Sequence, residues 1–359
     1  MLLLAILALI SAPYLAIGFI MLAYGRKQTL RKDYSHRPTV TVFVPTYNEE
    51  KNIGRKLDNL LTQTYPISET RIYDSSTDNT ARLVREYEEK HPSIKLITVP
   101  EDMTMAQILN RALREAKGEI VVKTDCDSLA KSRDALKELV ADFADPRVGG
   151  VTGVCVAERG LEKYFRALLT RLQVAESNID SVIIAHASSL LAFRKSAATP
   201  VSPDSMADDT EEFVLIRRKG YRTIVDAQVT SQEEQPRTFS ERRTQKDRRA
   251  QGIARALIQN RGILFRPRYN GYGLIVYPAN LFLLAISPIL LIAGATLFVS
   301  YVLAASSPPL LLATATTLAL VFAMARGFLL AAVDAQISGL VATARLTLGM
   351  NRAKWGRIR

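Results

Sequence analysis

The chain reads Val-Val-Lys-Thr-Asp-Cys-Asp-Ser over residues 121–128. The β-branched start predicts a short strand, and two carboxylates, Asp125 and Asp127, follow it one residue apart. Aspartates at such a strand end can hold Mg²⁺ or Mn²⁺, hard cations that keep positions open for water and substrate oxygens. We therefore interpret this stretch as the candidate centre of a phosphate-handling site. The alternative is an ordinary polar surface turn, because Asp-x-Asp is a short motif.

Apolar strands alternate with amphipathic helices between residue 38 and about residue 228. This alternation is typical of an α/β fold in which helices cover a mostly parallel sheet. Ligands of such sheets bind outside the carboxyl ends of the strands, where Asp74 and Asp125 lie. We predict strands at 40–45, 71–74, 95–99, 119–124 and 148–156, and helices at 48–63, 80–90, 104–117, 133–143, 211–219 and 238–260.

Several common site types lack their sequence signals. No Gly-x-Gly-x-x-Gly follows a predicted strand and no Gly-x-x-x-x-Gly-Lys-Ser/Thr occurs, so dinucleotide binding and P-loop chemistry lose their usual support. The three histidines have no metal-ligand spacing, which argues against a zinc site. With only Cys126 and Cys155 present, we predict reduced cysteines and no disulfide framework.

The net charge of +12 is concentrated in one segment. Between Arg237 and Arg268, ten residues are Lys or Arg and two are acidic. Such a segment could bind nucleic acid, anionic lipid or phosphorylated substrates. Because the uncharged stretch 269–325 follows directly, we predict membrane contact and no nucleic-acid binding.

Two stretches are apolar enough to cross a bilayer, for which an α-helix needs about 20 apolar residues. Residues 1–24 and 269–325 contain no charged side chain, and Ser306-Ser307-Pro308-Pro309 divides the second stretch into two predicted spans. Basic residues follow the first stretch and occupy the C-terminal tail, so the positive-inside rule puts both in the cytosol and the N-terminus outside. A cleaved signal peptide at residues 1–24 is disfavoured because no basic residue precedes the apolar run.

These signals predict an integral protein of the cell membrane with a cytosolic α/β domain. Residues 253–265 and 329–346 mix apolar and charged side chains, as helices lying in a membrane interface do. A fourth span over 329–346 is the alternative, but it would export the basic tail. The predicted parts are a transmembrane helix at 1–24, the α/β domain at 38–235, a basic segment with an interfacial helix at 236–268, transmembrane helices at 272–304 and 309–326, and an amphipathic, basic tail at 327–359.

Five motifs follow one another along this chain. They are Thr-Tyr-Asn-Glu at 46–49, Asp-Ser-Ser-Thr-Asp-Asn-Thr at 74–80, Asp-Cys-Asp at 125–127, Asp-Asp-Thr-Glu at 208–211 and Gln-Lys-Asp-Arg-Arg at 245–249. In order and spacing they resemble the inverting family 2 glycosyltransferases of GT-A fold. The flanking helices resemble those of the membrane-bound members, which include lipid glycosyltransferases and cellulose and hyaluronan synthases. The resemblance implies metal-dependent transfer of a sugar, with inversion, from a UDP- or GDP-sugar.

The resemblance also assigns roles on the donor side. Asp74 matches the carboxylate that accepts from the base, and Asp125 would face the ribose or uracil. Asp127 matches the ligand of Mg²⁺ or Mn²⁺, with Asp125 a possible second ligand. The loop that packs around the nucleotide is matched by Pro45, Thr46, Asn48 and Glu49. The same loop could instead serve only to cap the helix that follows it.

The remaining motifs concern the reaction and the leaving diphosphate. Asp209 matches the general base that takes the proton of the acceptor hydroxyl, although Asp208 and Asp209 could also simply cap a helix. Gln245, Arg248 and Arg249 match a Gln-x-x-Arg-Trp motif, in which Arg248 would meet the diphosphate.

Arg249 stands where the family has Trp, and this difference leaves the acceptor open. Tyr73 and Met105 also depart from the usual pattern. We expect transfer to a lipid or lipid-linked acceptor. A processive polysaccharide synthase that acts as a homo-oligomer, and an inactive GT-A-like membrane scaffold, are the alternatives.

Overall fold

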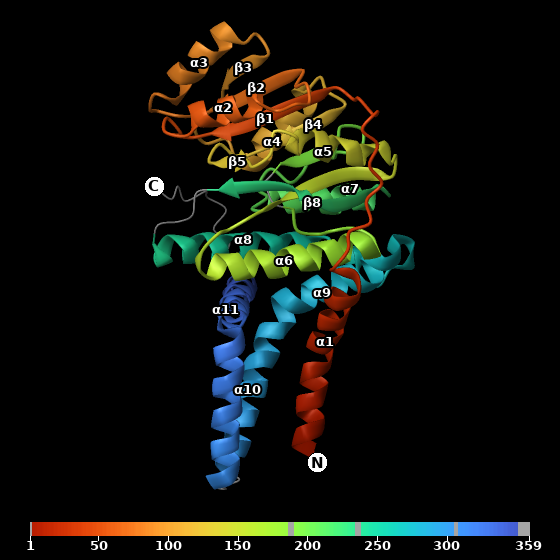
Figure 1. Ribbon diagram of the computed structural model, residues 1–359, viewed down its shortest axis with the longest axis vertical. Helices are drawn as coiled ribbons and strands as arrows, with labels where there is room; N and C mark the ends of the chain where they lie inside the picture. Colours follow the sequence, from red (N-terminus) through yellow and green to blue (C-terminus); the bar gives the residue numbers. More distant parts are fainter. Residues whose placement is uncertain (1, 186–189, 234–237, 305–307, 351–359) are drawn as a thin grey trace.

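The computed structural model describes residues 2–185, 190–233, 238–304 and 308–350. It has a head built around a β-sheet, a layer of helices that lie crosswise beneath the head, and helices that run away from it (Figure 1). Parts of four predicted segments lie outside the described residues: the N-terminal Met1, residues 186–189 and 234–235 of the α/β domain, the start of the basic segment at 236–237 and the tail after residue 350. The turn predicted at Ser306 and Ser307 lies outside them as well.

Within the described residues, one sheet of eight strands organises the head, in the order β3-β2-β1-β4-β7-β6-β8-β5. The pairs β1–β2, β2–β3, β1–β4 and β6–β8 are parallel, whereas β7 and β5 run antiparallel to their neighbours. The structure therefore confirms the predicted α/β class and its mostly parallel sheet. The strands are β1 Val40–Thr46, β2 Glu69–Asp74, β3 Ile94–Thr98, β4 Ile120–Lys123, β5 Ser128–Ala130, β6 Val148–Cys155, β7 Leu191–Arg194 and β8 Arg222–Glu233.

Helices cover both faces of the sheet. Alternate residues of β1 point to opposite faces, so Val42 packs in one core with Leu57 and Leu139, while Phe43 packs in the other with Leu109. The first core is closed by α2, α3 and α5, and the second by α4 and α7. These helices are α2 Ile53–Leu61, α3 Thr80–Lys90, α4 Met105–Glu115, α5 Ala135–Ala141 and α7 Asp208–Arg218.

The predicted elements are found with three corrections. The helix predicted from residue 48 begins only at Ile53, because the chain makes a left-handed turn at Asn48, where φ is +54°. The helix predicted at 211–219 begins earlier, at Asp208. The strand pattern does not end near residue 228, because β8 continues to Glu233. The sequence reading also missed β5, β7, β8 and helix α6, Gly160–Ile179.

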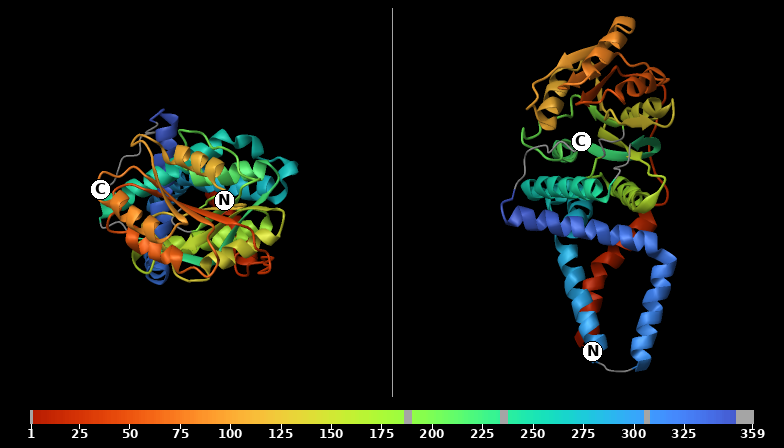
Figure 2. Two further views of the ribbon diagram at one scale, coloured as in Figure 1. Left: turned by 90° about the horizontal axis from the view of Figure 1, so that it is seen from above. Right: turned by 90° about the vertical axis from the view of Figure 1, so that its left-hand side faces the viewer.

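The crosswise layer consists of α6, α8 (Phe239–Gln259) and the second half of α11 (Pro308–Thr347). Helix α11 bends at Ala325, whose φ of −126° is not helical, and beyond the bend it runs crosswise under α8 and α6 (Figure 2). Leu257, in the segment predicted as an interfacial helix, is fully buried in a cluster with Tyr272 and Tyr277. The face of α8 that carries Leu257 is therefore packed inside the protein.

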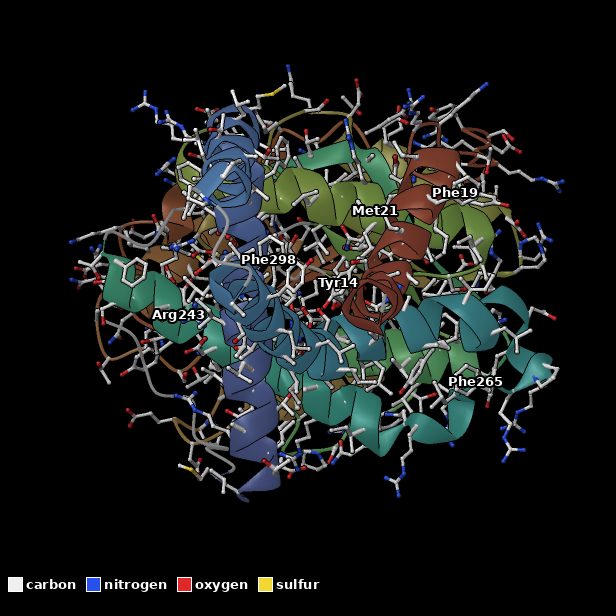
Figure 3. The ribbon with its side chains drawn as sticks, turned by 90° about the horizontal axis from the view of Figure 1, so that it is seen from below. Tyr14, Phe19, Met21, Arg243, Phe265 and Phe298 are labelled. Carbon is white, nitrogen blue, oxygen red and sulfur yellow. The ribbon has the colours of Figure 1, made fainter. Side chains whose placement is uncertain are left out.

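Helices α1 (Leu2–Tyr24), α10 (Ser287–Ala304) and the first half of α11 extend below this layer (Figure 1). Among the described residues, Tyr272–Ala304 and Phe322–Thr347 are helical stretches long and apolar enough to cross a membrane, although most of the second lies in the crosswise layer. Two 3₁₀-turns (Arg261–Ile263, Pro267–Tyr269), two π-helical turns (Tyr272–Val276, Phe282–Ile286) and α9 (Tyr277–Leu281) connect α8 to α10. Seen from below, Tyr14 of α1 lies beside the segment that leads into α10 (Figure 3). Its hydroxyl donates to the carbonyl of Ser287 at 2.8 Å.

The linker after α1 is held against the head by ion pairs of Lys32. The Lys32 Nζ lies 2.7 Å from Asp226 Oδ2 and 2.6 Å from Glu138 Oε2. Asp142 lies beside them in the 3₁₀-turn Asp142–Ala144, and its pKa is raised to about 9, first by burial and then by Asp226, against the opposing effect of Lys32. The folded protein therefore keeps Asp142 protonated at neutral pH.

This raised pKa predicts a loss of stability in mild alkali. Because Asp142 holds its proton in the folded chain and ionises near its usual pKa of 3.8 when unfolded, the folded state loses stability progressively from about pH 4, and this loss ends once Asp142 ionises in the folded chain near pH 9. Asp142→Asn cannot ionise, so its melting temperature should fall less than that of the unaltered protein between pH 7.5 and 9.5. Asp145→Asn is the control, because Arg147 lowers the pKa of Asp145. Equal falls for all three proteins would contradict the prediction.

Candidate functional site

The candidate site lies at the carboxyl ends of β1, β2 and β4. The pairing of β1 with β4 ends at Phe43 and Lys123, whereas the pairing of β1 with β2 continues through Pro45 to Thr46 and Asp74. Pro45 thus falls where β4 no longer needs an N–H donor, which allows a proline in a central strand. Strands β1 and β4 separate at this point, as expected at the crevice of an open α/β sheet.

The loops after β1 and β2 hold each other in place. The hydroxyl of Thr46 donates to Asp74 Oδ1 at 2.7 Å, and Asn48 Oδ1 accepts from the N–H of Thr77 at 2.9 Å. Asp74 is buried and also accepts from the hydroxyl of Ser76 at 2.5 Å. The predicted nucleotide loop and Asp74 therefore form one preorganised edge of the site. The predicted contact of Asp74 with a base stays a prediction.

A buried lysine that the sequence analysis did not assign lies under the Asp125–Asp127 turn. The Nζ of Lys56, from α2, donates to Thr124 Oγ1 at 2.6 Å and to the Ser128 carbonyl at 2.5 Å. Burial lowers the pKa of Lys56 to about 8, while Cys126, Asp125 and Asp127 oppose that shift. Lys56 thus ties both ends of the turn to α2.

Asp125 and Asp127 lie in a crowded acidic environment. The pKa of Asp127 is raised to about 7 by burial, then by Asp125, Glu233 and Glu49. Burial likewise raises the pKa of Asp125, against the opposing charge of Lys123. Such crowding favours a bound cation, and carboxylate oxygens are the ligands that Mg²⁺ and Mn²⁺ prefer. The two aspartates therefore fit the predicted metal.

No group of three or more His, Cys, Asp or Glu side chains suited to holding a metal ion occurs among the described residues. A cation at Asp127 and Asp125 would need further oxygen ligands from water or from a bound phosphate. This is the usual arrangement for Mg²⁺ in sites that bind nucleotides.

Asp208 and Asp209 open α7, where they lie beside the last residue of β4. Lys123 is fully buried, and its Nζ donates to Asp208 Oδ2. The pKa of Asp209 is raised to about 6 by burial and by Asp208, with Lys123 opposing the shift. Asp209 therefore combines a half-buried position with a carboxylate of raised basicity, as a general base requires.

Helix α8 brings two of the predicted arginines to this edge. Burial lowers the pKa of Arg248, as does Arg249, while Asp125 and Asp208 oppose the shift, which places Arg248 near both acids. Arg249 is exposed, and its Nη2 lies 3.7 Å from Glu233 Oε2 at the end of β8. Gln245 is half-buried one turn earlier, with no hydrogen bond to these groups among the described residues.

The structure thus brings together most of the residues that the sequence predicted. Mutual electrostatic effects link Glu49, Asp125, Asp127, Asp209, Arg248 and Arg249, whereas Thr46, Asn48 and Asp74 form the adjoining edge. The sequence reading missed Lys56, Lys123 and Glu233. A signal existed for two of them, since Lys123 is the one charge in β4 and Lys56 falls on the apolar face of α2 between Ile53 and Leu60.

Lys56 offers a test of how the turn is held. Lys56→Met keeps a long side chain but leaves Thr124 and Ser128 without their buried donor, which should cost about 1–3 kcal/mol for each acceptor. We expect a clearly lower melting temperature and weaker binding of Mn²⁺ with a nucleoside diphosphate, measured by calorimetry. Lys51→Met, at an exposed position before the same helix, should leave both unchanged. Unaltered binding by Lys56→Met would show that the turn keeps its form without this lysine.

Three comparisons with known proteins agree with this geometry. Residues 37–252, more than half of the chain, match the family model described as glycosyltransferase like family 2. The poly-beta-1,6-N-acetyl-D-glucosamine synthase of Staphylococcus epidermidis is 27% identical over 132 residues, which are 36% of this chain and 32% of that protein. An N-acetylglucosaminyltransferase of Rhizobium meliloti is 25% identical over 220 residues, 54% of this chain and 51% of that protein. The chain thus aligns with a third to a half of the length of these curated relatives.

A solved structure matches over nearly the whole chain. It is the mannosyltransferase PcManGT from Pyrobaculum calidifontis in complex with GDP-Man and Mn²⁺, with a TM-score of 0.77 and 30% sequence identity. The match covers 96% of this chain and 100% of that one.

Proposed function

This chain belongs to glycosyltransferase family 2 and has its GT-A fold, as the sequence predicted, and on this basis we propose that it transfers a sugar to a lipid or lipid-linked acceptor at a membrane. The proposed donor is a nucleoside diphosphate sugar, and the proposed transfer inverts the anomeric carbon. The observation that supports it best is the convergence of Asp125, Asp127, Asp209 and Arg248 at one edge of a head that stands on apolar helices.

On the donor side, Asp127 and Asp125 would hold Mg²⁺ or Mn²⁺. Such an ion supplies neutralisation of the charge that grows on the leaving diphosphate. Arg248 would bind the same phosphate oxygens, because a guanidinium matches their geometry in a forked contact. Thr46, Asn48 and Asp74 would hold the nucleoside from the adjoining loops. The mannosyltransferase with GDP-Man and Mn²⁺ supports this arrangement by analogy.

On the acceptor side, Asp209 would take the proton from the attacking hydroxyl. Inversion in a single displacement needs one carboxylate opposite the leaving group, and the raised pKa of Asp209 strengthens it as a base. Lys123 pairs with the neighbouring Asp208, and Asp209 Oδ1 accepts from the N–H of Thr210 at 2.8 Å, so both acids are held at the start of α7. Asp209 therefore is our proposed catalytic residue.

The acceptor is proposed from the surroundings of the site. The helices below the crosswise layer expose large apolar side chains such as Leu15, Phe19 and Leu303, which suit contact with lipid. The basic residues that precede α10 and follow α1 would face anionic head groups, and the head would then lie in the cytosol as predicted. A lipid that carries a hydroxyl or phosphate would then present that group to the site from the level of the head groups.

A polysaccharide synthase is the second candidate, because one matched relative is a poly-beta-1,6-N-acetyl-D-glucosamine synthase. That reading predicts long products made by an oligomer, whereas ours predicts a single sugar per acceptor. The two readings share their donor chemistry and differ in the product.

Product analysis tests the proposal directly. The purified full chain is incubated with radiolabelled GDP-mannose or UDP-N-acetylglucosamine, Mn²⁺ and a native lipid extract. We expect label in the organic phase as one discrete species, lost with Asp127→Ala. A ladder of water-soluble products would instead establish the synthase. Absence of both transfer and donor hydrolysis would indicate an inactive scaffold.

Asp209→Asn separates donor binding from chemistry. The substitution keeps the shape but removes the basic oxygen, so turnover should fall by about 10²–10⁴-fold while the dissociation constant of the nucleoside diphosphate with Mn²⁺ stays within about twofold. Asp102→Asn, at an exposed position before α4, is the matched control. If donor affinity collapses in Asp209→Asn, Asp209 belongs to the nucleotide pocket and is not the base.

A further inference from the structure

A carboxylate lies buried in an apolar helix outside the proposed site. Asp334 is in the second half of α11 and is 7% exposed, within a stretch apolar enough to cross a membrane. An unpaired carboxylate at such a position would be strongly unfavourable. Asp334 is instead surrounded by cations of α8, namely Arg242 and Arg243, each at 3.1 Å, and Lys246 at 2.8 Å.

The charges continue from this point towards the head. Lys246 Nζ also lies 3.1 Å from Glu162 Oε2 of α6, and it sits over the ring of Phe165 at 4.1 Å. Glu162 Oε1 in turn accepts from Arg166 Nε at 3.0 Å. The side chains of Lys246, Glu162 and Arg166 are each at most 11% exposed, so water screens these ion pairs little.

The run of charges ends beside the metal-binding turn. Arg166 pairs with Glu233 at the end of β8, and Glu233 also lies near Arg249. The charge of Glu233 acts on both Asp125 and Asp127. An unbroken alternation of acids and bases therefore connects α11, below the head, to the proposed donor site.

Helix α8 itself is a second connection between Asp334 and the proposed donor site. Its basic residues 242, 243 and 246 contact Asp334, and within the next turn Arg248 and Arg249 reach the site. Figure 2 shows the crosswise half of α11 beneath α8, and in Figure 3 Arg243 lies at this crossing. Because a helix moves as a stiff rod, a rotation of α8 at Asp334 would also displace Arg248.

We propose that Asp334 is a positioning residue for the donor site. Resting on the proposed function, this inference states that Asp334 fixes α8 and α6 from below, and so sets where Arg248, Arg249 and Glu233 lie relative to the Asp125–Asp127 turn. Affinity for the nucleoside diphosphate then depends on the position of the second half of α11 relative to α8 and α6. Donor binding is thereby coupled to the part of the chain that would meet the membrane.

The test measures donor affinity in the purified full chain reconstituted in lipid nanodiscs. Binding of GDP and of UDP with Mn²⁺ is followed by calorimetry for the unaltered protein, Asp334→Asn, Asp334→Glu and Lys246→Met. Asp334→Asn leaves three cations without their shared acid, so we expect about tenfold weaker binding, largely restored in Asp334→Glu. Lys246→Met should weaken binding to a similar degree, and the double variant should lose little more, because both residues act through one network.

Asp204→Asn is the matched control. It also removes the acidic partner of an arginine on α8, since Asp204 pairs with Arg255, but among the described residues neither side chain has a hydrogen bond or ion pair with α11. Its donor affinity should equal that of the unaltered protein. In steady-state assays, Asp334→Asn should raise the KM for the donor and leave the KM for the acceptor unchanged.

The possible failures are distinguishable. If Asp334→Asn folds, as judged by circular dichroism and gel filtration, and binds the diphosphate as tightly as the unaltered protein, the positioning role is overturned. Failure of Asp334→Glu to restore affinity would overturn it too, because the retained charge should suffice. If the unaltered protein binds neither GDP nor UDP with Mn²⁺, the proposed function itself is wrong.

Discussion

The buried ion pair between Lys123 and Asp208 is the interaction on which the carboxyl edge of the sheet depends. It joins the end of β4 to the start of α7, across 85 residues of sequence, at the point where the Asp125–Asp127 turn begins. Asp125 and Asp209 lie within the field of the same ammonium group. Removing one partner of such a pair leaves an uncompensated buried charge, at a cost of about 3–5 kcal/mol. Lys123 therefore permits several carboxylates to gather in one place.

The balance of charge at this edge suits the proposed ligand. Lys56 supports the turn from below, Lys123 lies beside it, and α8 adds arginines from the other side. Even so, burial and mutual repulsion raise the pKa of Asp125 and Asp127. A diphosphate alone would be repelled by these acids, and a divalent cation alone would lack ligands. Bound together they neutralise each other, which explains why acids and arginines share one site.

The crosswise layer links this site to the apolar helices. Helix α11 bends at Ala325, so its second half presents Asp334 and Ser338 to α8 and does not continue away from the head. The cost of burying Asp334 is offset by three basic residues of α8. The basic character of α8, which composition alone associates with lipid, is thus partly used within the protein.

Local patterns in the sequence predicted the α/β class and the family, which the structure and the family match confirm, and they also predicted the residues that we propose for the site. Alternating strands and helices, the Asp-x-Asp spacing and the ordered motifs are local patterns, and Asp125, Asp127, Asp209 and Arg248 were found from them. The contacts of Lys56, Lys123 and Glu233, the antiparallel β7 and the ion pairs around Asp334 are visible only in the folded chain. The reason is that these features join residues distant in the chain, such as Lys246 and Asp334, which are 88 positions apart. A charge whose partner is supplied by another element leaves no periodic or adjacent signal, and from composition it is indistinguishable from a charge exposed to water.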